Sequence, residues 1–237
     1  MSQITTLTVL NYKGFSNKFW ALSMMQFGHN YMKSVKGLSF YKLMGSGKDH
    51  FNPFPDWSVY SVLQVWESED AAQTFFETHK LSKVYQSHAD KMQVYYLESI
   101  QARGLWNAKN PFESTVNAKE MEPDSEIAVI TRASIKTKML LKFWKYVPES
   151  QKPLENAKGL IYTKGFGELP FVEMATFSVW KDLESLQAYA YQSREHIKAI
   201  QKTRELDWYS EELFSRFRIQ KKHFERALSF KSAFNVS

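Results

Sequence analysis

Residues 177–217 read FSVWKDLESLQAYAYQSREHIKAIQKTRELDWYSEELFSRF, a strand end followed by a long helical pattern and then an aromatic and acidic segment. Asp182 stands where a helix N-cap belongs, and Glu184 falls in the first turn, where the helix dipole favours a carboxylate. From Leu183 onward, apolar residues recur at nearly helical spacing. The stretch therefore predicts a β-strand that leads into an amphipathic helix.

His196 lies at the edge of the apolar face of this helix. Tyr189 is seven residues before it and Ile200 is four residues after it, so both share its side of the helix. Ser193 and Ala199, one turn away on either side, are small, which leaves space for a planar ligand above the imidazole. A histidine in this position is also often a partly buried core residue. Spacing alone leaves both interpretations open.

The rest of the chain alternates between β-branched stretches and stretches with helical spacing. The first half is expected to follow the order βαββαβ, with strands at 6–12, 37–47, 58–66 and 92–97 and helices at 16–32 and 68–89. The second half is expected to follow βαββα with a less regular close, with strands at 127–135, 159–167 and 171–180 and helices at 139–146 and around His196.

The two halves also resemble each other residue by residue. Gly37 leading to Lys42 matches Gly159 leading to Lys164 at the same internal spacing. Further matches are Phe19-Trp20 with Phe143-Trp144, Val65-Trp66 with Val179-Trp180, and Gln73 with Gln187. Matched order, spacing and element type indicate a duplication. In this alignment His196 falls opposite Ser82, so the histidine belongs to the second half alone.

Each βαββαβ unit corresponds to the ferredoxin-like fold, whose sheet carries helices on one face and leaves the other face bare. Two copies packed sheet to sheet bury both bare faces. We therefore predict an α+β fold in which two tandem ferredoxin-like repeats, residues 1–102 and 127–237, form an αβ barrel. Residues 103–126 contain glycine and prolines among polar residues and are expected to form the linker.

Amino-acid composition limits the kinds of ligand and cofactor that the chain can bind. The 237 residues are 43% hydrophobic and 16% aromatic, which suits either a pocket for a large apolar ligand or a well-filled core. The absence of cysteine excludes disulfides, thiolate nucleophiles, iron–sulfur clusters and a thiolate-ligated haem. A net charge of +6 favours an acidic partner, such as an acidic electron carrier or anionic lipid. Nucleic acid is not an expected partner, because the chain has no nucleic-acid motif and no long basic run.

The ends of the chain bear on localisation. The N-terminus lacks the layout of a signal peptide, and no apolar run reaches the roughly 18 residues of a membrane span. We therefore expect a cytoplasmic protein, with peripheral contact to the inner membrane as an open alternative. Residues 220–237 interleave basic and apolar side chains, which is typical of a surface-seeking amphipathic tail or of a solvated terminal helix.

Seven phrases in order resemble the spheroidene monooxygenase (acyclic carotenoid 2-ketolase) family. They are GFSNKFWALSMM (14–25), GLSFYKLMGSG (37–47), ARGLW (102–106), TRASI (131–135), KGFGELP (164–170), TFSVW (176–180) and WYSEELFSRF (208–217). The resemblance covers nearly the whole chain. It implies a haem-containing protein of the dimeric αβ-barrel type, with haem b as cofactor. It also implies oxygen-dependent oxidation of an acyclic carotenoid, with a ferredoxin-type electron donor.

The resemblance also implies site residues. His196 matches a family histidine and is expected to ligate the iron, with Gln192 one turn earlier fixing its other ring nitrogen. Candidate hydrogen-bond donors on the opposite side of the haem are Arg132, Lys164 and Ser178. Alternatively, the two cations pair with carboxylates and the serine points outward on its strand. Residues expected to line the cofactor or a polyene channel are Met24, Met25, Met44, Phe166, Phe177 and Trp180, although such side chains are also typical of a core.

Three other interpretations remain open, and the first is a haem enzyme of the same barrel that acts on a non-carotenoid substrate. A cofactor-free oxygenase needs only a shaped apolar pocket and one base on the same barrel. A non-catalytic haem- or carotenoid-binding protein needs only the pocket. Paired catalytic carboxylates at Glu211 and Glu212 are unfavourable, because adjacent side chains on a helix point about 100° apart. The sequence leaves the substrate, the redox partner and the oligomeric state open.

Overall fold

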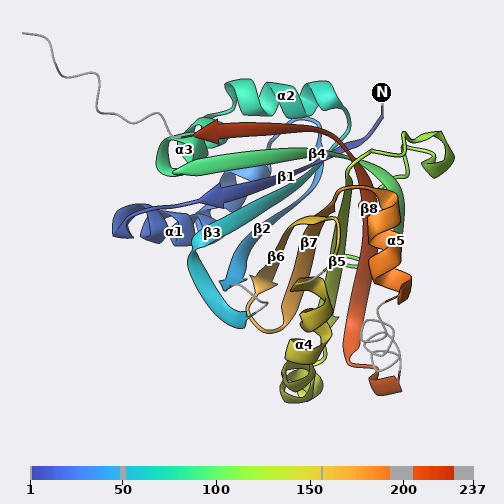
Figure 1. Ribbon diagram of the computed structural model, residues 1–237. Helices are drawn as coiled ribbons and strands as arrows, with labels where there is room; N and C mark the ends of the chain where they lie inside the picture. Colours follow the sequence, from blue (N-terminus) through green and yellow to red (C-terminus); the bar gives the residue numbers. More distant parts are fainter. Residues whose placement is uncertain (1, 49–51, 156, 193–204, 227–237) are drawn as a thin grey trace, which may run out of the picture.

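The computed structural model describes residues 2–48, 52–155, 157–192 and 205–226. In these ranges eight strands close into one barrel with helices on its outside (Figure 1). The strands are β1 Ile4–Asn11, β2 Leu38–Lys48, β3 Asn52–Trp66, β4 Lys91–Gly104, β5 Ile127–Ile135, β6 Leu160–Leu169, β7 Glu173–Trp180 and β8 Tyr209–Arg226. The helices are α1 Phe15–Met32, α2 Glu69–Thr78, α3 Lys80–His88, α4 Leu140–Glu155 and α5 Leu183–Gln192, with short 3₁₀ turns at Ala118–Glu120 and Thr137–Met139.

The strand order around the barrel is β1-β3-β2-β6-β7-β5-β8-β4. Read as halves, it gives β4-β1-β3-β2 and β8-β5-β7-β6, which is the same arrangement twice. The predicted α+β barrel of two tandem ferredoxin-like repeats is therefore confirmed. The halves meet at two seams of unequal size. The β4–β8 seam pairs 13 residues on each strand, whereas the β2–β6 seam pairs only Gly45 with Gly167 and Ser46 with Phe166.

At the short seam, matched positions of the two repeats pair with each other. Gly45 follows Lys42 by three residues, Gly167 follows Lys164 by three residues, and the two glycines face each other across the seam. The lysines bridge the halves reciprocally. Lys42 of the first half contacts Glu168 on β6, and Lys164 of the second half contacts Asp56 on β3 at 3.1 Å. Matched sequence positions thus perform matched structural roles.

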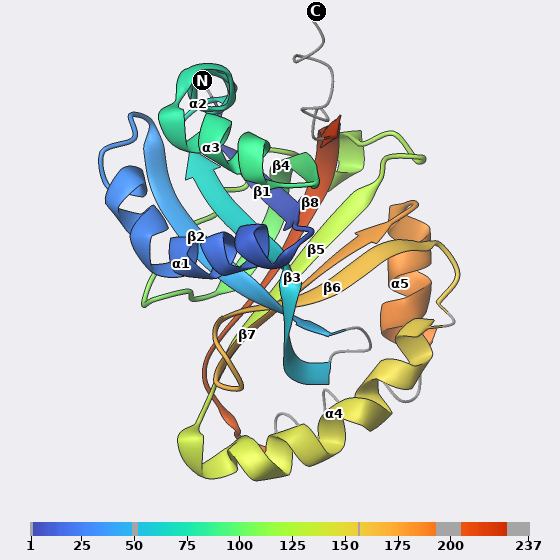
Figure 2. The same cartoon turned by 90° about the vertical axis from the view of Figure 1, so that its left-hand side faces the viewer.

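Alternation along the strands separates a barrel interior from an outer face. Large apolar side chains fill the interior, among them Trp106, Phe166, Phe177 and Phe217, each at most 1% exposed. Figure 2 shows α1, α2 and α3 over the first half, α5 beside the second half, and α4 below the lower end of the barrel. Within the described ranges, the apolar cluster under the first three helices has 18 buried residues, whereas the cluster of the second half has six.

The end of the chain corrects the sequence analysis. The segment that begins with the aromatic and acidic residues is strand β8, and it continues to Arg226 between β4 and β5. The expectation of a terminal helix is therefore wrong for residues 220–226, where basic and apolar side chains follow a strand. Residues 227–237 lie outside the described ranges. The helix expected at 68–89 is two helices, because the chain turns extended at His79.

None of the helices in the described ranges combines the length and the apolar composition of a membrane span.

Candidate functional site

Motifs that are far apart in the sequence meet in one polar network inside the barrel. Trp106, just after β4, is fully buried, and its indole N–H donates to Glu168 Oε1 at 2.6 Å. Lys42 contacts the other oxygen of Glu168 and donates to Asn107 Oδ1 at 2.5 Å. The loop that follows β4 is therefore held to β2 and β6 by a lysine and a carboxylate.

The second part of the network surrounds Arg132 on β5, which is 2% exposed. Its guanidinium contacts Glu211 on β8 and donates to Glu173 on β7 at 3.1 Å. Glu211 also accepts from the backbone N–H groups of Asn107 and Ala108, both at 2.8 Å. These two residues have φ values of 56° and 61°, a left-handed conformation that side chains disfavour. Glu211 thus stabilises a strained turn and a buried cation together.

The carboxylates in this region are held in their charged form. Burial alone would raise the pKa of Glu211. The backbone N–H groups of Ala108 and Asn107 and the Arg132 guanidinium outweigh this effect, so the pKa is lowered. The pKa of Asp56 is lowered in the same way, because the hydrogen bonds from Ser58 and the Lys164 ammonium outweigh its burial. Carboxylates with lowered pKa values are poor proton acceptors, so this network favours structure over acid–base catalysis.

The predicted site residues divide between the two faces of the sheet. Arg132 and Lys164 lie in the interior and pair with carboxylates, as the alternative interpretation of these cations expects. Met44, Phe166 and Phe177 are buried in the same interior.

Ser178 and Trp180 lie on the opposite, outer face of β7. The indole of Trp180 donates to Ser178 Oγ at 3.0 Å, and its ring packs against Tyr189 of α5 at 5.1 Å between centroids. Gln192 is the last described residue of α5, and His196 lies outside the described residues. The structure therefore does not bring the three candidate donors together, and the iron ligand remains a prediction.

The outer face of the second half has features that fit a flat ligand. Thr131 on β5 and Phe214 on β8 are paired neighbours on this face, and both are exposed. Thr163 on β6 pairs with Ser178, and its buried hydroxyl has no hydrogen-bond partner among the described residues. A buried hydroxyl without a partner is costly, so a group that hydrogen-bonds there would be stabilising.

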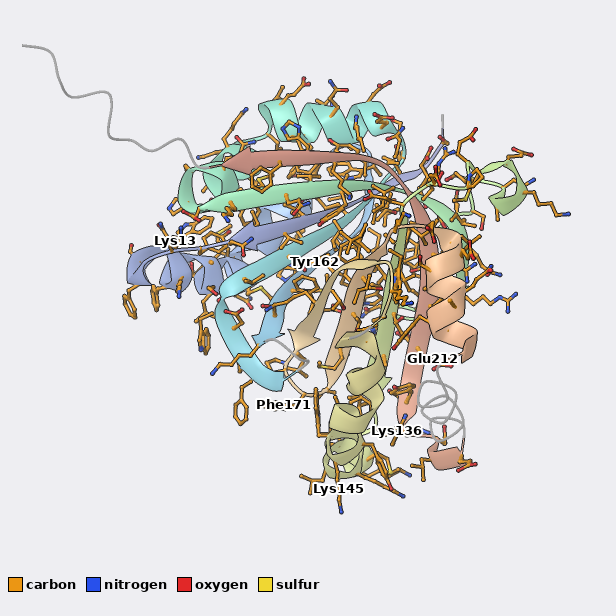
Figure 3. The ribbon with its side chains drawn as sticks, viewed as in Figure 1. Lys13, Lys136, Lys145, Tyr162, Phe171 and Glu212 are labelled. Atoms are coloured by element: carbon orange, nitrogen blue, oxygen red, sulfur yellow. The ribbon has the colours of Figure 1, made fainter. Side chains whose placement is uncertain are left out.

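A separate cavity of about 210 Å³ opens where the short seam ends. Its walls come from α1, β2, β3, β6 and the β6–β7 turn, and most of them are apolar. Residues that contribute are Leu22, Met25, Trp57, Phe166, Phe171 and Met174, with Asp56 as a charged group. Phe171 lies at the lower end of the barrel, between β3 and α4 (Figure 3). Of the residues predicted for the channel, Met25 and Phe166 line this cavity.

The network partners and most of the cavity residues were not predicted from the sequence. Glu168, Glu173 and Trp106 were not singled out as site residues, although two of them lie in quoted motifs. The available signal was the pair of glycine turns, GSG and GFG, because residues without side chains leave space where two strands meet. Barrel closure determines which strands become neighbours there, and neither motif contains that information.

Comparisons with known proteins identify the family. No protein-family model matches the chain. Spheroidene monooxygenase of Rhodobacter capsulatus is 33% identical over 217 residues, which cover 91% of this chain and 90% of the relative. The Cereibacter sphaeroides protein of the same name is 32% identical, with 92% and 67% covered.

Two solved structures agree in fold alone. A crystal structure of aldoxime dehydratase has a TM-score of 0.63 at 11% identity, over 94% of this chain and 83% of the other. Aldoxime dehydratase OxdRE in complex with butyraldoxime has a TM-score of 0.66 at 8% identity, over 95% and 83%. At such identities a shared fold carries no information on activity. The sequence relatives do carry it, because their identity extends over nine tenths of the chain: the chain belongs to the spheroidene monooxygenase family and is an oxidoreductase.

Proposed function

We propose that this monooxygenase oxidises an acyclic carotenoid, or a similarly long apolar molecule, using O₂, haem b and electrons from a ferredoxin-type donor. One oxygen atom would enter the substrate and the other would leave as water, with two electrons from the donor and two protons from solvent. The observation that carries the substrate class is the similarity to proteins named spheroidene monooxygenase, and the apolar cavity at the β2–β6 seam has room for part of such a molecule.

We place the haem on the outer face of the second half rather than in the barrel. The interior is filled by buried aromatic side chains, whereas the outer face carries the unpartnered Thr163 hydroxyl and the exposed Thr131 and Phe214. His196 would hold the iron and Gln192 would orient its ring. When bound, the haem would supply the iron at which O₂ is activated.

Ser178 and Thr163 are the hydrogen-bond donors that we propose for a group bound on this face. Arg132 and Lys164 are less suited to that role, because they point to the other face of the sheet and are already paired with carboxylates. Their charge stabilises the barrel instead. The net charge of +6 favours docking of an acidic ferredoxin-type protein, since long-range attraction speeds such encounters.

Haem titration followed by absorption spectroscopy tests the cofactor. We expect the protein to develop a Soret band and His196→Ala to lose it. His29→Ala is the matched control. His29 lies on the first half of the barrel, where it contacts Tyr41, so this substitution should leave the Soret band unchanged. An unchanged spectrum in His196→Ala would exclude this residue as the ligand.

Turnover tests the activity. Reduced ferredoxin, O₂ and spheroidene in detergent micelles should give an oxidised carotenoid that carries ¹⁸O when ¹⁸O₂ is supplied. Oxygen consumption by haem-free protein would instead identify a cofactor-free oxygenase. Haem or carotenoid binding without any product would identify a binding protein.

A further inference from the structure

Helix α1 is apolar on the side that faces solvent. Phe15, Phe19 and Leu22 are 86%, 63% and 40% exposed, and at 100° per residue they fall within one stripe. The rings of Phe15 and Phe19 stack with centroids 6.3 Å apart. The opposite side of the helix is packed against the barrel through Ala21, Met24, Gly28 and Met32. A surface helix normally presents polar residues to water, so the exposed stripe needs another explanation.

The stripe continues across the mouth of the seam cavity. Leu22 lines that cavity together with Trp57 and Phe171, which are 52% and 37% exposed. Phe54, 62% exposed, packs edge-on against Phe171 with centroids 6.3 Å apart. In Figure 3, α1, the lower end of β3 and Phe171 follow one another along the lower left edge of the molecule. We call Phe15, Phe19, Leu22, Phe54, Trp57 and Phe171 the apolar band.

Lysines predominate among the charged residues near α1 and the apolar band. Residues 1–48 contain six lysines and no acidic residue, and α1 itself has none. Lys33 and Lys36, just beyond the end of α1, are exposed. The two carboxylates that line the cavity, Asp56 and Glu168, are each paired with a lysine. Lys13 is likewise paired, with Asp90 at 3.1 Å, so the excess positive charge near the band comes from other lysines such as Lys33 and Lys36.

We propose that the apolar band docks on an anionic lipid bilayer, with the seam cavity opening toward the lipid. Exposed aromatic residues next to lysines, on a helix without acids, are the composition of an interfacial membrane helix. A second copy of this chain is a less favourable occupant, because two positively charged surfaces would repel each other. The entry of an apolar substrate from the lipid rests on the proposed function, whereas docking does not.

Vesicle flotation of the full chain tests docking directly. We expect binding to vesicles of phosphatidylcholine with phosphatidylglycerol and much weaker binding to phosphatidylcholine alone. Phe15→Ser and Phe19→Ser should each weaken binding by about tenfold, since each removes an aromatic ring from the lipid. Phe224→Ser is the matched control, because this phenylalanine is 57% exposed but lies on β8, outside the band. Its binding should equal that of the unaltered chain.

A site-specific label gives a second readout. The chain has no cysteine, so Phe19→Cys carries a single environment-sensitive fluorophore, and Phe224→Cys provides its control. Anionic vesicles should shift the emission of the Phe19 label to the blue and leave the Phe224 label unchanged. Absence of binding to anionic vesicles, equal loss in Phe224→Ser, or a concentration-dependent dimer that Phe19→Ser abolishes would overturn the proposal. All measurements omit haem and substrate, so their failure is independent of the proposed activity.

Discussion

Arg132 illustrates how a single buried charge determines its surroundings. Its guanidinium is almost fully removed from water and is stabilised by Glu211 and Glu173, which lie on two different strands. A buried cation that loses a partner costs several kcal/mol, so these strands are constrained to their register. The same carboxylate of Glu211 fixes the left-handed turn at Asn107 and Ala108. One acidic residue therefore connects the linker to the barrel wall.

The first prediction concerns Glu211→Gln. The substitution removes the negative charge beside Arg132, and we expect the free energy of unfolding at pH 7 to fall by roughly 2–4 kcal/mol. Because the pKa of Glu211 is lowered from 4.5 in the folded state, its stabilisation is complete above about pH 4.5 and is lost as the pH falls through the folded pKa. The difference between the two proteins should therefore shrink in acid. Urea unfolding at several pH values measures it.

Glu212→Gln is the control for this prediction. The neighbouring Glu212 is exposed and points to the outer side of β8 (Figure 3), so its substitution should change stability by less than about 0.5 kcal/mol. If both substitutions destabilise the protein equally, the carboxylate of Glu211 has no special role.

Among the elements, strand alternation determined which predictions were correct. Period two along β7 places Phe177 inside and Ser178 outside, and the sequence pattern contains that information. Whether Arg132, Lys164 and Ser178 share one site depends on whether their side chains lie on the same face of the barrel sheet. That depends on barrel register, set by pairings between distant segments, so no local pattern could supply it.

Strand β8 was missed for a related reason. Its inward residues include Leu213, Ser215 and Phe217, and the serine interrupts the apolar alternation because it bonds to the backbone of Ile130 instead. The strand exists because β4 and β5 flank it on both sides. The repeat of order and spacing, in contrast, was readable, because duplication leaves matched residues such as Lys42 and Lys164 at matched positions.

The second prediction concerns Gly45 on β2, at the wall of the seam cavity. A Cβ atom built there would meet no atom within 4 Å, so Gly45→Leu should fold normally and place its side chain in the cavity. We expect the melting temperature to stay within a few degrees, while KM for spheroidene rises and turnover falls about tenfold. Melting curves and steady-state kinetics measure both effects.

Gly45→Ala is the matched control for the loss of backbone freedom. It removes the same flexibility but fills little of the cavity, so its kinetics should remain near those of the unaltered protein. Unchanged kinetics in the leucine variant would show that substrate binds elsewhere, and the outer face of the second half would become the main candidate.

For the whole molecule, the important asymmetry is between the two seams. Thirteen residue pairs join β4 to β8, whereas two pairs join β2 to β6. The short seam is supplemented by the reciprocal contacts of Lys42 with Glu168 and Lys164 with Asp56, which cross it in opposite directions. The cavity and the exposed aromatic side chains lie at this same seam. The strand-to-strand contact with the fewest paired residues is thus also the one next to the cavity, where a ligand could enter.

The third prediction follows from this asymmetry. Backbone amides in residues 44–47 and 165–168 should exchange with deuterium at least about tenfold faster than those in residues 93–97 and 217–222. Local opening is easier where fewer strand hydrogen bonds must break together. Added salt should change this ratio little, because the lysine–carboxylate pairs of the short seam are largely buried and are therefore only weakly screened. Hydrogen–deuterium exchange with peptide mass spectrometry measures both. Equal protection at the two seams would mean that the buried lysine–carboxylate contacts hold the barrel closed as firmly as a full strand ladder, and substrate would then have to enter without the seam opening.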